Sequence, residues 1–286
     1  MQLRPSPIER FLCKSPHDRQ VAKNLLEKTT VIGITYFSRF ENLWIKSVLM
    51  PTDWPCVTCP NRKFGFCGAL LDTPEETQSQ KQPNWQHYRA ARPGEQIIIR
   101  NQTSDDVFVL CDGWAFRFFQ LSNGRRQILN FLLPGDLFST VAVFEDRPNF
   151  SAQALTEARL SGFSRSEVRA RCAADSRMTA ALAKSCIAET YSADGLLTAL
   201  GQRSAEERIA YLFLHLMQRI AARSVIREQR YRLPLRQQHI ADAVGLTAVH
   251  VSRVISLFRD QGLIEFSSGV LQVLNLPELK RIGSLD

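Results

Sequence analysis

Short runs of β-branched and aromatic residues, separated by turn-forming pairs, follow Pro93-Gly94 along the chain. Asp112-Gly113 and Asn123-Gly124 suit tight hairpins because these residues tolerate a positive φ, and Pro134-Gly135-Asp136 marks a further turn. The runs that we expect to form strands are Gln96–Arg100, Val107–Cys111, Trp114–Gln120, Gln127–Leu133, Phe150–Leu155 and Arg159–Phe163. Strands at this spacing predict a small antiparallel barrel or roll.

After Ser164 the hydrophobic period changes to three or four residues, which is typical of an amphipathic helix. We expect one long helix over Met178–Leu200, with a bend at Gly195 left open because glycine is a poor helix former. Its recurring small or apolar residues are the candidate dimerisation residues, namely Leu182, Cys186, Ala193, Leu196 and Leu200. A stripe of this length predicts a homodimer, and the alternative is ordinary core in a monomer.

The last third of the chain has a helix-turn-helix pattern. Ser204 and Glu207 have the spacing of a capping box, which predicts the start of a helix. Beyond it, Gly245 separates two short amphipathic stretches with apolar positions at Ile240, Ala241, Val244, Val251, Val254, Ile255 and Phe258. A hairpin over Ile264–Val273 would form the wing of a winged helix-turn-helix. This pattern predicts double-stranded DNA as the partner, and protein contact is the alternative.

The second helix of this motif begins with residues suited to DNA recognition. Arg253 can bind guanine O6 and N7 through its planar fork, and Thr247 and Ser252 suit a phosphate or a base edge. The candidate DNA-binding residues are Arg236, Gln237, Thr247, Ala248, His250, Ser252 and Arg253. We interpret His239 as a surface residue.

The charge balance supports a polyanionic partner. Lysine and arginine number 36 against 28 aspartate and glutamate, a net charge of +8 in 286 residues. No apolar run of about 18 residues could cross a membrane, and the N-terminal region lacks the layout of an export signal, so we expect a cytoplasmic protein. No Gly-rich phosphate loop, nucleophile elbow or zinc-protease helix is present, which argues against an enzyme.

Three cysteines, Cys56, Cys59 and Cys67, lie close together in a proline-containing, irregular stretch over 51–92, where we expect no packed element. Their spacing is typical of an iron–sulfur cluster or of a zinc or redox thiol site, and a site without metal is the third interpretation. The Cys56/Cys59 pair also raises thiol–disulfide exchange as an alternative, enzymatic function. That alternative is disfavoured because the pair does not open a helix after a parallel strand.

Three stretches resemble the CRP/FNR family of bacterial transcription regulators, and the resemblance covers about residues 86–280. They read GRRQILNFLLPGDLF at 124–138, SAEERIAYLF at 204–213 and IADAVGLTAVHVSRVISLFRDQGLI at 240–264. The resemblance implies an α+β fold with an N-terminal antiparallel β-roll (a cyclic-nucleotide-binding-like jelly roll), a long dimerisation helix and a C-terminal winged helix-turn-helix. It also implies a homodimer on a two-fold symmetric DNA site and contact with RNA polymerase.

The chain then divides into five segments. They are an N-terminal extension of unknown role at 1–50, a cysteine-containing segment at 51–85, a β-roll sensory domain at 86–165, a dimerisation helix at 166–202, and the winged helix-turn-helix domain at 203–286. Met50 directly precedes the cysteine-containing segment, so an open alternative is that residues 1–49 are an upstream extension of the reading frame.

The chain departs from the family at two functional positions. Family members that bind cyclic AMP resemble one another in a ribose glutamate and a phosphate arginine, whereas the corresponding stretch here reads Ser139-Thr140, then Phe150-Ser151. A buried phosphate without a cation is costly, so we expect no cyclic AMP binding. FNR-like regulators have a glutamate where Val249 stands, so their DNA half-site does not transfer to this chain.

The cysteine pattern resembles that of FNR-like oxygen sensors from alphaproteobacteria, which hold an oxygen-labile [4Fe-4S] cluster. In those proteins the fourth ligand lies late in the β-roll, near the stretch that here reads ARLSGF at 158–163 and contains no thiol. Cys111 is our candidate fourth ligand, with Cys13 as the alternative, so the expected ligand set is Cys56, Cys59, Cys67 and Cys111. A regulator without metal that senses a different small effector is the alternative function.

Overall fold

The computed structural model describes Cys56, Cys59 and residues 65–71, 84–224 and 226–283. All of these residues belong to one compact unit, Asp53–Asp286. The predicted extension over 1–50, which includes Cys13, lies outside the described residues, as does most of the predicted cysteine-containing segment.

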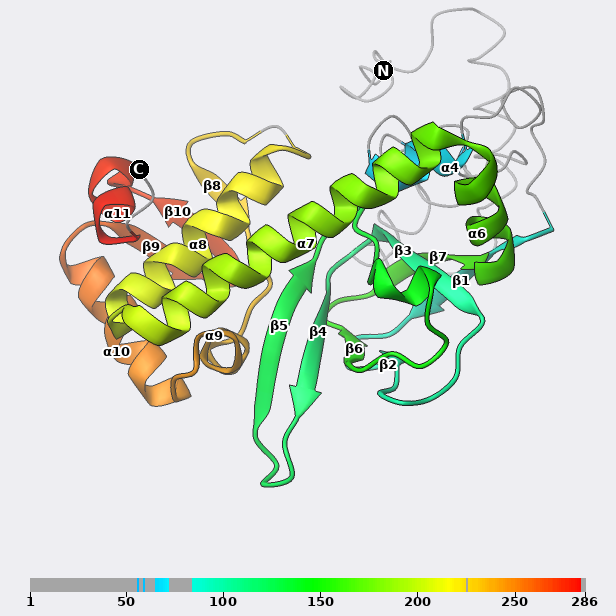
Figure 1. Ribbon diagram of the computed structural model, residues 1–286. Coiled ribbons are helices and arrows are strands. Elements are labelled where there is room, and N and C mark those ends of the chain that lie inside the picture. Colours follow the sequence, from blue (N-terminus) through cyan, green and yellow to red (C-terminus); the bar gives the residue numbers. More distant parts are fainter. Residues whose placement is uncertain (1–55, 57–58, 60–64, 72–83, 225, 284–286) are drawn as a thin grey trace, which may run out of the picture. The chain divides into compact units, whose positions relative to one another are not determined.

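The β-rich half forms the predicted antiparallel roll. Two sheets have the strand orders β1-β7-β3 and β2-β6-β4-β5, and β4 and β5 form a long hairpin (Figure 1). The strands are β1 (Gln86–Ala91), β2 (Gln96–Ile98), β3 (Asp106–Asp112), β4 (Ala115–Gln120), β5 (Arg126–Leu132), β6 (Ser151–Ala154) and β7 (Ala158–Ser164), with a short 3₁₀ helix, η2 (Val141–Val143), after β5. The six predicted strands are confirmed. The pattern did not reveal β1 because its sequence, QHYRAA, lacks alternating apolar positions.

Large apolar side chains fill the interior of the roll. Phe108, Leu110, Leu132, Phe138 and Leu160 belong to one buried cluster, and each is at most 6% exposed. Removing this much apolar surface from water stabilises the roll, because burial contributes about 25 cal/mol per Å². The packed strands therefore fix the positions of the residues that they carry, among them Cys111 on β3.

A helix in the cysteine-containing segment corrects the expectation that this stretch has no packed element. Helix α4 (Gly65–Leu71) buries Phe66 and Leu70, each 1% exposed, in a cluster with Met178 and Leu182. Two apolar residues four positions apart make one face of a helix. The pattern was missed because it covers only two turns and is surrounded by polar residues and prolines.

The predicted dimerisation helix at 166–202 is two helices. Helix α6 (Arg165–Ala174) ends at Asp175, whose extended backbone and side chain begin α7 (Ser176–Gln202). The Asp175 carboxylate accepts a hydrogen bond from the Arg177 backbone N–H at 2.8 Å, as an N-cap residue does. Helix α7 continues without a break through Gly195.

Glycine at position 195 permits the close approach of α7 to α8 (Ala205–Ala221). A Cβ atom added to Gly195 would lie 1.9 Å from the Tyr211 hydroxyl oxygen. We expect Gly195→Ala to lower the free energy of unfolding by about 1–3 kcal/mol, although alanine is the better helix former. Gly201→Ala on the same helix is the control because its Cβ would meet nothing within 4 Å. Urea unfolding measures both, and a Gly195→Ala variant as stable as Gly201→Ala would contradict this packing.

The C-terminal half confirms the predicted winged helix-turn-helix. It contains α8, β8 (Arg230–Arg232), α9 (Gln237–Val244), α10 (Ala248–Asp260), β9 (Ile264–Ser267), β10 (Val270–Val273) and α11 (Leu276–Gly283). The predicted capping box of α8 is present, since the Ser204 N–H donates to Glu207 Oε2 at 2.6 Å and the Glu207 N–H donates to Ser204 Oγ at 3.3 Å. The wing is a three-stranded sheet of order β8-β10-β9, in which β8 adds a strand that was not predicted.

Candidate DNA-binding surface and cysteine site

Helices α9 and α10 meet with the geometry of a helix-turn-helix. The chain bends by 104° between them. Gly245 makes this turn in the left-handed region, at φ 67°, and its N–H donates to the Ala241 carbonyl oxygen. Within the described residues, no single helix is long and apolar enough to span a membrane, and α9 with α10 meets that criterion only as this bent pair.

The predicted DNA-binding residues lie at the start of α9 and in the first two turns of α10. Thr247 is the N-cap of α10, and its Oγ1 accepts a hydrogen bond from the His250 N–H at 3.2 Å. Val251 and Val254 are buried, which turns the opposite face outward. Arg236, Gln237, Thr247, His250 and Arg253 are exposed, and Ala248 and Ser252 are half-buried. The fold therefore leaves most of these residues exposed on α9 and α10, and their contact with DNA stays a prediction.

We expect Arg253→Ala to cost about 1–3 kcal/mol of binding on the preferred DNA site and to relax specificity at one position of each half-site. Arg253 is exposed near the start of α10, where recognition helices meet base edges. Arg259→Ala, at an exposed position in the last turn of the same helix, is the control. Gel-shift titrations on the selected site and its point variants measure both, and an equal loss for Arg253→Ala on every sequence would assign Arg253 to a phosphate.

His239 is not the surface residue that we expected. Its ring is half-buried 5.8 Å from the Phe116 ring, and its Nδ1 accepts a hydrogen bond from the Arg236 N–H at 3.1 Å. Burial, with the nearby Arg126 and Arg236, lowers the pKa of His239 to about 4. His215 on α8 behaves similarly, because burial and then Arg219 lower its pKa to about 4.

Both histidines make the stability depend on pH. Their folded-state pKa values lie below the ordinary 6.5, so the unfolded chain binds more protons between pH 6.5 and about 4. The free energy of unfolding is expected to fall as the pH falls through this window, by at most about 1.4 kcal/mol per pH unit for each histidine. His215→Gln is expected to reduce this slope in urea unfolding, and an unchanged slope would contradict the assignment.

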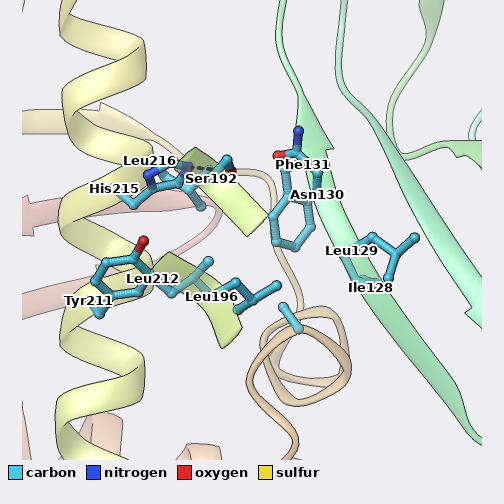
Figure 2. Close-up of a pocket in the computed structure, with 11 residues that line it drawn as sticks. Ile128, Leu129, Asn130, Phe131, Ser192, Leu196, Tyr211, Leu212, His215 and Leu216 are labelled. Carbon is cyan, nitrogen blue, oxygen red and sulfur yellow. Dashed lines mark hydrogen bonds between the residues drawn. The ribbon is translucent and has the colours of Figure 1, made fainter. Parts of the chain in front are cut away.

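Helix α7 carries the candidate dimerisation residues on more than one face. Leu182 is 6% exposed and packs in the core of its own chain, so it is not available to a partner. Leu196 lines a pocket between β5, α7 and α8, where Figure 2 shows it near Leu212. Cys186 and Ala193 are exposed, and Leu200 is half-buried. The exposed apolar residues on α7 that sequence reasoning missed are Ile187, Tyr191 and Leu197.

The fold brings Cys111 into electrostatic reach of the three N-terminal cysteines. Cys67 lies on α4, and Cys111 lies on β3 where the pairing with β7 shifts between Leu110 and Asp112. Bulges of this kind commonly redirect a side chain. Cys56 Sγ lies 2.9 Å from the Tyr88 hydroxyl and accepts a hydrogen bond from Gln86 Nε2 at 3.3 Å.

Burial and neighbouring thiols raise the pKa values of Cys67 and Cys111. Burial raises the pKa of Cys67, and negative charge on Cys111, Cys56 or Cys59 raises it further. Burial, followed by Cys56 and Cys59, raises the pKa of Cys111 to about 12. Cys59, Cys67 and Cys111 are not in disulfide bonds. In that part of the chain, no three His, Cys, Asp or Glu side chains are arranged to hold a metal ion.

Two family models match separate parts of the chain. A cyclic nucleotide-binding domain matches residues 88–175, and a Crp-like helix-turn-helix domain matches residues 207–282. These ranges coincide with the roll and the winged helix-turn-helix described above.

Curated relatives and solved structures agree with these models. The nitrogen fixation regulation protein FixK of Azorhizobium caulinodans is 34% identical over 173 residues, 60% of this chain and 69% of the relative. The transcriptional activator protein FnrL of Cereibacter sphaeroides is 28% identical over 218 residues, 73% of this chain and 83% of the relative. The structure of FixK2 from Bradyrhizobium japonicum is 25% identical with a TM-score of 0.63, over 69% of this chain and 96% of that one. The chain therefore belongs to the CRP/FNR family of DNA-binding transcription regulators and is of the alphaproteobacterial type.

Proposed function

We propose that this regulator binds a two-fold symmetric DNA site as a homodimer in the cytoplasm, contacts RNA polymerase, and responds to oxygen or redox state through a [4Fe-4S] cluster. The cluster would be held by Cys56, Cys59, Cys67 and Cys111. The protein would act without any enzymatic reaction of its own. The observation that carries the sensing proposal is that Cys56 and Cys59 lie near enough to raise the pKa of both Cys67 on α4 and Cys111 on β3.

The donor set fits an iron–sulfur cluster. All four side chains supply sulfur, and each thiolate of a [4Fe-4S] cluster binds a different iron atom, so its ligands lie farther apart than those of a single ion. Cys56 and Cys59 raise the pKa of both Cys67 and Cys111, which supports a common site for these thiols. A single zinc ion, the alternative, requires four ligands around one centre. When bound, the cluster supplies a group that oxygen can oxidise.

The surroundings of the thiols favour such a group. Gln86 Nε2 donates to Cys56 Sγ, and the Tyr88 hydroxyl lies within hydrogen-bond distance of the same sulfur. Hydrogen bonds to sulfur help to set the potential of a cluster. Binding of cationic iron would also ionise thiols that burial otherwise keeps protonated.

A packed path joins this site to the dimerisation helix. Cys67 lies on α4 beside Phe66 and Leu70, which share a buried cluster with Met178 and Leu182 of α7. Ligation of Cys67 would therefore fix α4 against α7, and loss of the cluster would release it. The side chains exposed farther along α7, Ile187, Tyr191 and Leu197, would form the face that meets the second copy.

The test is purification without oxygen. We expect brown protein with about four iron and four sulfide per chain, and DNA affinity that falls when the same sample is exposed to air. Colourless protein without iron, whose DNA affinity air does not change, would contradict the sensing proposal and support a regulator that senses a different effector. Stoichiometric zinc would support a structural metal site.

A further inference from the structure

An ion pair between Arg117 of β4 and Glu189 of α7 joins the roll to the middle of the long helix. Arg117 Nη1 donates to Glu189 Oε2 at 3.1 Å. The other carboxylate oxygen, Oε1, accepts a hydrogen bond from the backbone N–H of Thr140 at 2.9 Å. The Arg117 and Glu189 side chains are only 15% and 22% exposed. Both oxygens of one carboxylate on α7 are therefore held by the roll.

Arg117 depends on this carboxylate for its charge balance. Its guanidinium lies over the Phe150 ring, 4.9 Å from the centroid, and Nη1 also donates to the Phe138 carbonyl oxygen at 2.9 Å. Its Nε is buried without a hydrogen-bond partner. Glu189 is the one carboxylate paired with Arg117 in the part of the chain that the structure describes. Without Glu189, a largely buried cation would lose its partner, which is costly.

The position of Glu189 along α7 makes the contact important for the direction of the helix. The fully buried residues of α7 are Met178 and Leu182 near its start and Ala199 near its end. Between Leu182 and Ala199 no side chain of α7 is fully buried, so Glu189 is a polar anchor midway between two apolar contacts. Hydrogen bonds to charged groups are short and directional, and they define a geometry better than apolar contacts do.

The same contact is enclosed by buried residues of the roll. Ser139 and Thr140 are 2% and 6% exposed, and Phe150 is 4% exposed beneath Arg117. A negatively charged small molecule entering between Arg117 and Thr140 would have to displace Glu189, because both already bind that carboxylate.

We infer that Glu189 is a positioning residue for DNA binding: its carboxylate links Arg117 and Thr140 to α7 and fixes the angle of this helix without a small-molecule effector. The inference rests on the proposed homodimer, in which α7 relates the two recognition helices. Any tilt of α7 relative to the roll then changes how both α10 helices meet DNA.

The test compares Glu189→Ala and Glu189→Gln with the wild type on one DNA selected from a random-sequence pool. Anisotropy titration gives the affinity, stoichiometric titration gives the active fraction, and hydrogen exchange follows the Thr140 amide. We expect the Glu189→Ala active fraction to bind about tenfold more weakly, within the usual range of coupling between sites, and the Thr140 amide to lose protection. Glu189→Gln keeps an acceptor for the Thr140 N–H but loses the charge, so its DNA affinity is expected to lie between those of Glu189→Ala and the wild type. This variant replaces Glu189→Ala in the test if the alanine variant does not fold.

Glu95→Gln is the matched control because it removes a carboxylate of the same roll that pairs with Arg89 at 2.8 Å in a more exposed position. It is expected to bind DNA as the wild type does, and millimolar cyclic AMP is expected to leave the wild-type affinity unchanged. The inference is overturned if the active fractions of both Glu189 variants bind like Glu95→Gln, even with lower stability, or if cyclic AMP tightens wild-type binding. A wild type that binds no DNA would instead contradict the proposed function.

Discussion

Serine in place of Cys67 or Cys111 is expected to abolish iron binding and, with it, the difference in DNA affinity between anaerobic and air-exposed protein. A hydroxyl is a much weaker iron ligand than a thiolate, and Cys67 is only 8% exposed, which limits replacement by water. Iron and sulfide analysis of anaerobically purified variants measures the first effect. Titration of DNA before and after exposure to air measures the second.

Cys186→Ser is the control for these variants, since Cys186 is exposed on α7 and is outside the proposed ligand set. It is expected to keep iron and the response to oxygen. If Cys111→Ser kept a full iron complement while Cys13→Ser lost it, the fourth ligand would come from the N-terminal extension. Wild-type behaviour of the serine variants at Cys56, Cys59, Cys67 and Cys111 would refute the cluster.

Replacement of Asp136 by asparagine is expected to lower the free energy of unfolding by about 3–5 kcal/mol, the usual effect of removing one partner from a buried ion pair. Asp136 binds Arg219 through Oδ2 and Arg223 through Oδ1, each at 2.5 Å. Its side chain is 16% exposed, and that of Arg219 is 17% exposed. The variant would leave Arg219 of α8, and Arg223 just beyond the end of that helix, without the Asp136 counter-charge at the turn that follows β5. Urea unfolding measures the effect.

Glu278→Gln provides a matched control, because Glu278 pairs with Arg281 on α11 at 2.6 Å, where the Arg281 side chain is 73% exposed. An exposed pair of this kind contributes at most about 1 kcal/mol. The Asp136 network would be disproved as a structural link between the roll and α8 if both variants had the same stability.

The winged helix-turn-helix was predictable because its determinants are local. Gly245 permits the turn, Ser204 and Glu207 cap α8 reciprocally, and Val251 and Val254 recur on one face of α10. Each of these signals acts over a few residues and depends on backbone geometry that neighbouring residues impose. The recognition residues could therefore be placed before any tertiary contact was known. The turns at Gly113 and Gly124 made most of the strands predictable for the same reason.

The cysteine site was only partly predictable. The spacing of Cys56, Cys59 and Cys67 is visible in the chain, but Cys111 could be selected only as the remaining thiol of the roll. Its approach depends on the register of β3 against β7 and on the shift in that register after Leu110. Pairing between strands far apart in sequence leaves no periodic signal in either strand.

The sequence by itself determined the type and order of the elements, the turn residues and the recognition helix. Only the tertiary structure decided which face of α7 packs against the rest of the chain, with Leu182 buried and Ile187 exposed. The contact between Glu189 and Arg117 likewise depends on tertiary packing. The helical period shows that a stripe is apolar but does not show what covers it. Ion pairs such as Asp136 with Arg219 join residues that are distant along the chain, so they depend on how the roll and α8 pack together.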